Sequence, residues 1–141
     1  MQMLKNGTCS LNNLDSELID KIYTQNGYKV LYPEILSIKD TIATLKNCEE
    51  FVAQSGSNAH NAIFLNDNAK ITILNRSAHF HPCQTMINRL RNLQVTYIDV
   101  FWKALPVDWS YGPFIFLYTD KLKQYFVSNH FRYNAKKIRE R

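Results

Sequence analysis

The chain has 141 residues, a formal net charge of +5, and 45% hydrophobic and 21% charged residues, which corresponds to about one globular domain. No apolar run approaches the ~20 residues of a membrane-spanning helix, and the first residues lack the apolar core of a signal peptide. Three widely spaced cysteines form no disulfide framework, so the sequence predicts a soluble, cytoplasmic protein.

The first predicted helix lies between Asn13, which would cap it, and Gly27, which can take the left-handed conformation that ends a helix. Residues 28–32 then predict a short strand, which Pro33 closes. The apolar residues of this helix recur at the four-residue spacing of one buried face: Leu14, Leu18 and Ile22.

A second unit begins with a capping box, in which Ser37 is followed three residues later by Asp40 in place of the usual glutamate. A strand at 51–53, a polar loop at 54–57 and a helix through residue 64 come next. The helix that follows the capping box is predicted to bury Ile38, Ile42 and Leu45.

The second half of the chain predicts a strand at 71–74, a helix at 83–93, a strand at 95–101, a looser stretch at 102–117 and a last helix at 119–131. Strands that alternate with ten-residue helices predict a mostly parallel sheet with helices on both faces. We therefore expect one Rossmann-like α/β domain of four or five strands over residues 1–141. The helix at 83–93 is predicted to bury Met86, Ile87, Leu90 and Leu93.

Ligands of an open α/β sheet bind beyond the carboxyl ends of its strands, which directs attention to the loop at 54–61. Its glycine allows a sharp turn, and its hydroxyls and the N–H groups of the next helix could hold a phosphate. The same residues also allow a purely structural interpretation, with Ser57 as a helix cap and His60 as a satisfied surface histidine. The residues concerned are Ser55, Gly56, Ser57, His60 and Asn61.

In the loop after the strand at 71–74, Arg76 could neutralise a phosphate. His79, His81 and Cys83 alternate there, but their spacing matches no structural zinc site and a fourth ligand is not evident, so we expect no metal and no cofactor. Glu34 also follows a predicted strand and is a candidate base or ribose acceptor, or a residue that stabilises the next turn.

The basic tail at 136–141 could contact acidic lipid at the inner membrane surface, or it could simply be solvated. Elsewhere lysine and arginine are scattered among acidic residues. This pattern predicts no nucleic-acid partner.

The order of several motifs resembles the C-terminal part of glycosyltransferase family 61. That family has a glutamate–leucine helix, a G-[FY]-x-V-x-x-P-E strand, an L-S-x-x-x-x-I helix and a G-x-H-G-A-x-x-x-N-x-x-F loop. The resemblance covers about residues 11–76. The matching segments here are Leu14 to Ile19, Gly27 to Glu34, Leu36-Ser37 with Ile42, and Gly56, Asn61 and Phe64.

The resemblance implies one Rossmann-like half of a GT-B enzyme, the half that binds a nucleotide-sugar donor for surface or capsular polysaccharide synthesis in bacteria. It places Gly56, Ser57 and Asn61 at the donor diphosphate, and we add Ser55 and Arg76 to that side. Glu34 is expected at the nucleotide. The family's His-Gly-Ala is replaced here by Ser55-Gly56-Ser57, so we expect either that His60 takes the catalytic role or that the chain has lost activity.

The family's N-terminal half has no counterpart in this sequence. We therefore expect the acceptor site to lie on a second domain or subunit, and the chain alone to transfer no sugar. The alternative is a non-catalytic interaction module that packs an aromatic face against a partner, through Trp102, Trp109, Tyr111 and Phe114.

Overall fold

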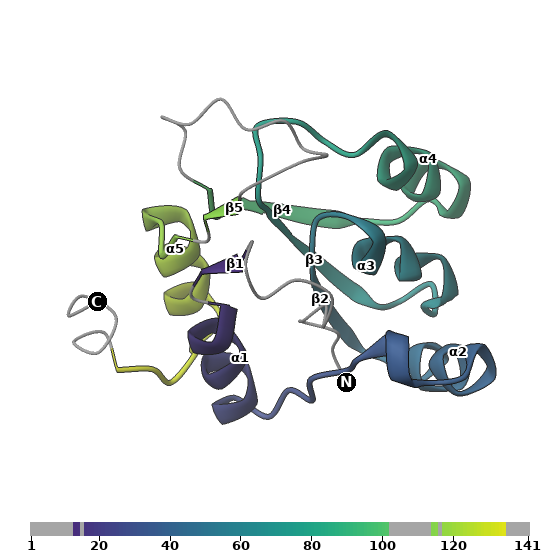
Figure 1. Cartoon of the computed structure of the whole chain (residues 1–141), viewed down its shortest axis with the longest axis horizontal. Coiled ribbons are helices and arrows are strands. Elements are labelled where there is room, and N and C mark those ends of the chain that lie inside the picture. The colour runs from purple at the N-terminus through teal and green to yellow at the C-terminus, as the bar shows by residue number, and fades with distance from the viewer. Residues whose placement is uncertain (1–12, 15, 102–113, 116, 135–141) are drawn as a thin grey trace.

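The computed structural model describes residues 13–14, 16–101, 114–115 and 117–134. Within these ranges, three parallel strands form an open sheet in the order β2 (Glu50–Gln54), β3 (Lys70–Asn75), β4 (Val95–Asp99). A separate parallel pair joins β1 (Asn13–Leu14) to β5 (Phe114–Ile115). The predicted α/β class with an open parallel sheet is confirmed (Figure 1).

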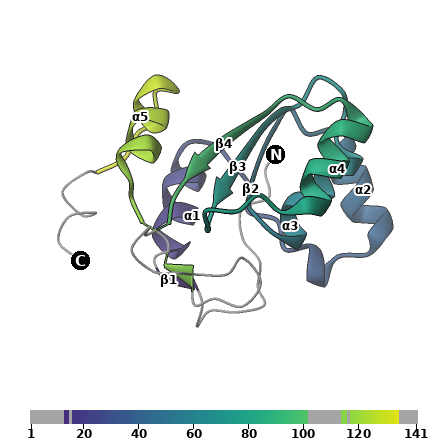
Figure 2. The same ribbon diagram turned by 90° about the horizontal axis from the view of Figure 1, so that it is seen from above.

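Helices cover both faces of the sheet, as predicted (Figures 1 and 2). One face carries α1 (Ser16–Gln25) and α5 (Asp120–Ser128). The other carries α2 (Ile38–Lys46), α3 (Ser57–His60) and α4 (Pro82–Arg91). Two short 3-10 helices complete this second layer: η1 (Pro33–Ile35) and η2 (Asn61–Phe64).

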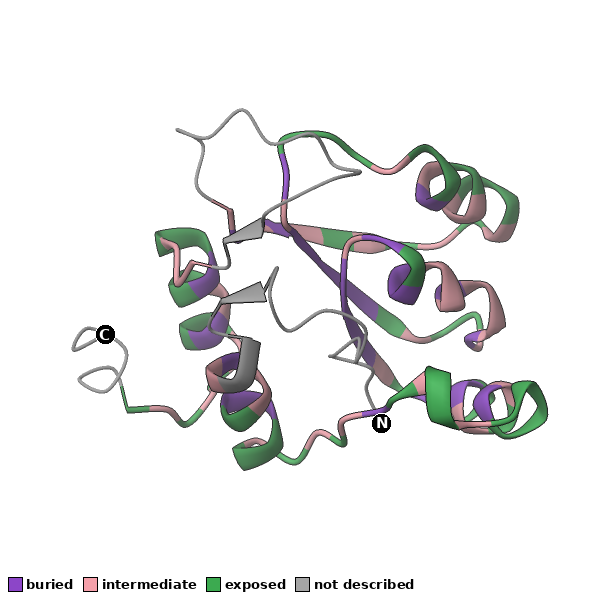
Figure 3. Ribbon diagram, in the orientation of Figure 1, coloured by how far each residue is buried: buried purple, intermediate pink, exposed green. Residues whose placement is uncertain are grey.

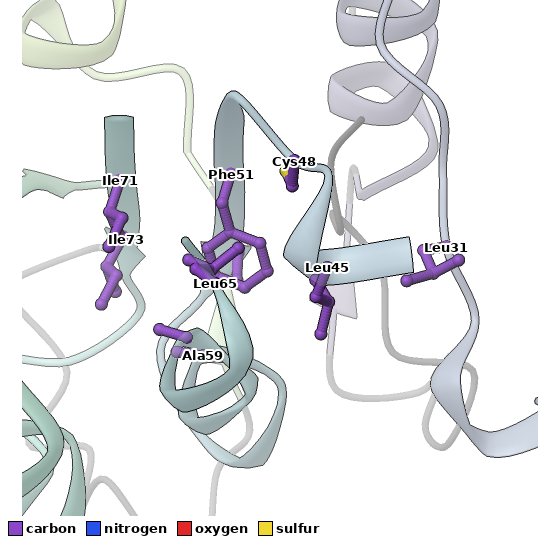
Figure 4. Close-up of a cluster of buried hydrophobic side chains, with 10 residues drawn as sticks. Leu31, Leu45, Cys48, Phe51, Ala59, Leu65, Ile71 and Ile73 are labelled. Atoms are coloured by element: carbon purple, nitrogen blue, oxygen red, sulfur yellow. The ribbon is translucent and has the colours of Figure 1, made fainter. Parts of the chain in front are cut away.

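The strands β2 and β3 are buried on both faces, as expected of a parallel sheet between two helical layers (Figure 3). Successive residues of β2 therefore serve different cores. Phe51 and Ala53 face the α2–α3 layer, whereas Val52 packs with α1 and α5. Figure 4 shows the first of these cores, where Phe51 lies among Leu45, Ala59 and Leu65.

Two of the predicted helix ends are confirmed in detail. Gly27 follows α1 with a φ of +86°, the left-handed conformation that lets the chain turn away. Ser37 caps α2, because its Oγ accepts a hydrogen bond from Asp40 N at 3.1 Å. The Ser37 hydroxyl also donates to Asp40 Oδ2 at 2.6 Å, so the two side chains brace each other.

We expect Ser37→Ala to lower the free energy of unfolding by about 1 kcal/mol, since it removes the cap acceptor from the first turn of α2. Urea unfolding followed by circular dichroism measures the change. Lys39→Ala, in the same turn and likewise exposed but without a cap bond, is the control and should change stability far less. Equal effects of the two variants would show that the cap bond contributes nothing.

The prediction of a strand at 28–32 is wrong. The backbone is extended there but pairs with no strand in the described part of the chain. Turns constrain both ends, since Tyr28 N donates to Tyr23 O and Ile35 N donates to Tyr32 O. Leu31 is nevertheless buried in the α2–α3 core, which explains the apolar pattern.

Some residues that were predicted to be buried are exposed. Ile38 is 77% exposed at the start of α2, whereas Thr41 and Leu45 of that helix are buried. In α4, Met86 and Leu90 are exposed and Gln84 is buried instead. The inner face of α4 is polar and is partly satisfied by hydrogen bonds. Gln84 Nε2 donates to Asn88 Oδ1 at 2.8 Å and Asn88 Nδ2 donates to Tyr97 Oη at 2.7 Å, whereas the buried Gln84 Oε1 has no partner among the described residues.

The aromatic face of the alternative prediction, a non-catalytic interaction module, lies largely outside the described residues. Trp102, Trp109 and Tyr111 are not among them, and Phe114 is described only as part of β5. No helix in the described ranges is long and apolar enough to span a membrane.

Candidate functional site

The two loops that the sequence singled out lie side by side at the carboxyl edge of the sheet. The register of β2 and β3 pairs Gln54 with Leu74, so both strands end at the same level. Ser55 N donates to Leu74 O at 2.9 Å, and Arg76 N donates to Ser55 Oγ at 3.3 Å. Ser55 therefore ties the β2–α3 loop directly to the β3–α4 loop.

Gly56 and Arg76 approach each other closely across these loops. Gly56 has φ +125° and ψ −161°, a backbone conformation that is essentially reserved for glycine. A Cβ atom at this position would lie 2.8 Å from Arg76 Nη2. The absent side chain thus makes room for the guanidinium group against the backbone of residue 56.

The guanidinium of Arg76 is partly withdrawn from water, and this burial lowers the pKa of Arg76 from its ordinary value. An arginine remains protonated in proteins even so. Residues 68–98, which include β3, α4 and most of β4, contain no aspartate or glutamate. The carboxylate of Asp99, which is paired with Asn75 at the same edge, is bound by Lys121 Nζ. The edge around Arg76 therefore keeps a positive balance that suits an anion.

The helix after Gly56 is shorter than the sequence suggested. α3 makes one turn and continues as the 3-10 turn η2. Gly56, not Ser57, occupies the N-cap position, so the interpretation of Ser57 as a cap is wrong. Ser57 is exposed, and Asn61 Nδ2 donates to Asn58 O at 3.3 Å. A one-turn helix has little macrodipole, so Arg76 is the stronger attraction for an anion here.

His60 meets a second histidine from the neighbouring loop. The ring centroids of His60 and His81 lie 4.6 Å apart, with the planes at 66°. Burial, and after it the charge of His81, lowers the pKa of His60. His60 Nε2 is buried and has no hydrogen-bond partner among the described residues. His79 and Cys83 are exposed, and the described part of the chain holds no cluster of three potential metal ligands.

A cleft of about 260 Å³ adjoins this edge, between η1, α2 and η2. It is mostly apolar, with Asn61 among its walls and Thr41 supplying a buried hydroxyl that has no partner in the described structure. Glu34 is exposed in η1, next to a lining residue. The lining residues are Pro33, Leu36, Ile38, Thr41, Asn61 and Phe64.

The structure thus brings together Ser55, Gly56 and Arg76, whereas Asn61 lines the adjoining cleft. Sequence reasoning missed two features. It did not pair His60 with His81, because contacts between loops leave no local signal. It also assigned Thr41 no role, although a polar residue on the buried face of α2 was visible in the pattern.

Residues 10–72 match the family model described as Glycosyltransferase 61. The matched stretch includes the Gly56 loop, His60 and Asn61 and ends within β3, so Arg76 and His81 lie beyond it. No curated protein and no solved structure matches the chain.

Proposed function

We propose that this chain is the donor-binding part of a glycosyltransferase of surface or capsular polysaccharide synthesis. The similarity to Glycosyltransferase 61 over residues 10–72 supports glycosyl transfer as the reaction class. The location of the donor site is supported by the Arg76 guanidinium, which lies against Gly56 at the carboxyl edge of the sheet. Open α/β folds bind their ligands at this edge.

The donor diphosphate binds at this edge. Arg76 offers a fixed cation, and arginine forms charge-assisted hydrogen bonds to phosphate oxygens. Ser55 is held beside it, since its Oγ already accepts from Arg76 N. Ser57 and Gly56 contribute a hydroxyl and backbone N–H groups from the adjoining turn. In transfer, the same groups stabilise the charge that develops on the leaving diphosphate.

The nucleoside binds in the adjoining cleft. Its volume of about 260 Å³ and its apolar walls suit a flat ring, and Thr41 and Asn61 supply polar groups that orient one. Glu34 stands at the rim, where its carboxylate can accept hydrogen bonds from ribose hydroxyls. Asn61 belongs both to the cleft and to the loop of the diphosphate, which makes the two subsites continuous.

His60 is the catalytic residue in this scheme, and the acceptor binds on a second domain or subunit. Sugar transfer needs a base for the acceptor hydroxyl as well as help for the leaving group. It also needs the two substrates positioned against each other. The chain alone therefore binds donor but does not elongate a polysaccharide.

Arg76→Gln should weaken nucleoside diphosphate binding by about tenfold to a hundredfold, since it removes a charge-assisted contact. The measurement is a titration with UDP, GDP and CDP, followed by the amide NMR signals of residues 55–61. Arg89→Gln is the matched control, because Arg89 is an exposed arginine in the last turn of α4.

In the unmodified chain, at least one of these nucleotides should shift the amide signals of Gly56 and Asn61. If millimolar nucleotide leaves all of them in place, the donor site is not here. If Arg76→Gln and Arg89→Gln weaken binding equally, the effect is one of net charge, and the assignment of Arg76 fails.

A further inference from the structure

The His60–His81 pair joins the two loops of the site and has no role in the similarity to known proteins, because His81 lies outside the matched residues. Each ring comes from a different βα connection. His60 closes the single turn of α3, and His81 is the N-cap residue of α4, directly before Pro82. The pair therefore depends on the fold and not on sequence proximity.

His81 is held in place by the helix it begins. Its backbone oxygen accepts hydrogen bonds from Thr85 N at 3.1 Å and from Thr85 Oγ1 at 3.4 Å. Its side chain forms no cap bond to α4, which leaves the ring to lie edge-on against His60. The ring of His60 is thus fixed by a neighbour that is itself anchored to a ten-residue helix.

The surroundings of His60 disfavour a positive charge. Its ring is partly buried, and His81 is a basic neighbour at 4.6 Å between centroids. The first turn of α4, which follows His81, contains no acidic residue. The arginines of α4 lie in its last turn, where Arg91 is bound to Asp67 at 2.7 Å. No carboxylate among the described neighbours compensates a protonated His60.

We propose that His81 is a positioning residue for His60, which fixes the ring and keeps it neutral so that His60 accepts a proton from a sugar hydroxyl. This inference rests on the proposed function, which supplies the hydroxyl. In the transfer step, the proton moves from the acceptor hydroxyl to an imidazole nitrogen of His60 while that oxygen bonds to the anomeric carbon. The bond from this carbon to the diphosphate breaks, and its electron pair leaves on the diphosphate oxygen.

An NMR titration of the imidazole signals tests the pair in the whole chain and without nucleotide. The chain has four histidines, so single substitutions assign every signal. In the unmodified chain, the pKa of His60 should lie below the ordinary value of histidine, because burial and His81 both favour the neutral form.

His81→Phe keeps a ring against His60 but removes the basic nitrogen atoms, so the pKa of His60 should rise. His81→Ala also opens the ring to water, and the rise should be larger. His79→Gln is the control, since His79 is an exposed histidine of the same loop, and it should leave the pKa of His60 unchanged.

A His60 pKa that is unmoved in His81→Phe and His81→Ala, or that rises as much in His79→Gln, would overturn the inference. A merely structural contact would change stability without this ordered shift. Because no nucleotide is present, the result is independent of the Arg76 experiment. A shifted His60 in a chain that binds no nucleotide would confirm the pair but remove its catalytic meaning, and the proposed role would fall.

Discussion

Gly56→Ala is expected to lower the free energy of unfolding by about 2–4 kcal/mol and to abolish nucleotide binding at the carboxyl edge of the sheet. Two costs add. A non-glycine residue is strained at φ +125° and ψ −161°, and the new Cβ would lie 2.8 Å from Arg76 Nη2. The guanidinium group of Arg76 must move, and it is the cation that the site needs. Urea unfolding and the nucleotide titration measure the two effects.

Gly27→Ala is a control that contains the strain without the collision. Gly27 also has a positive φ, +86°, but nothing lies within 4 Å of the position a Cβ would take. Its cost should be about 1 kcal/mol, and binding should persist. The double variant Gly56→Ala/Arg76→Ala removes the collision and should be more stable than Gly56→Ala alone. If Gly56→Ala costs no more than Gly27→Ala, the loop can rearrange and the tight contact is not required.

Features with a local cause could be predicted from the sequence. The end of α1 at Gly27 and the cap of α2 at Ser37 could be predicted because each depends on a few consecutive residues. The alternation of helix and strand likewise predicted a parallel sheet with two helical layers, since parallel neighbours need crossovers. Gly56 was singled out for the correct reason, a backbone that only glycine tolerates.

Features that depend on a partner could not be predicted in this way. The segment at 28–32 has the composition of a strand, but pairing also requires a free neighbour. The exposed Met86 and Leu90 of α4 fit a helical stripe, yet the fold buries the polar side opposite them. Periodicity reports that a helix is amphipathic, and hydrogen-bonded polar groups can still occupy its inner face.

The same distinction between local features and long-range contacts applies to the candidate site. Composition located both loops, because carboxyl ends of strands can be recognised from the chain. The packing of Arg76 over Gly56 and of His81 on His60 joins residues about twenty apart in sequence and was not visible in it. The candidate residues could be named from the sequence, whereas the contacts between them follow from the register of β2 and β3.

Phe126→Ala is expected to lower the free energy of unfolding by about 3–5 kcal/mol, a large part of the stability of a domain of this size. Phe126 is fully buried in the layer of α1 and α5, with its ring centroid 4.9 Å from Phe131 and 5.7 Å from Tyr23. Alanine would leave a cavity between the two helices and remove these and the other aromatic contacts of Phe126. Urea unfolding at several temperatures measures the loss.

Val127→Ala is the matched control, since Val127 is the next residue of α5 and is 60% exposed. Its stability should change by no more than about 0.5 kcal/mol. Phe126 lies in the core on the face of the sheet opposite to α3, so Phe126→Ala should still bind nucleotide under conditions where it is folded. A stability loss no larger than that of Val127→Ala would show that α5 does not pack on the sheet. Loss of binding in the folded variant would show that the two helical layers are coupled, because the site would then depend on the core on the opposite face of the sheet.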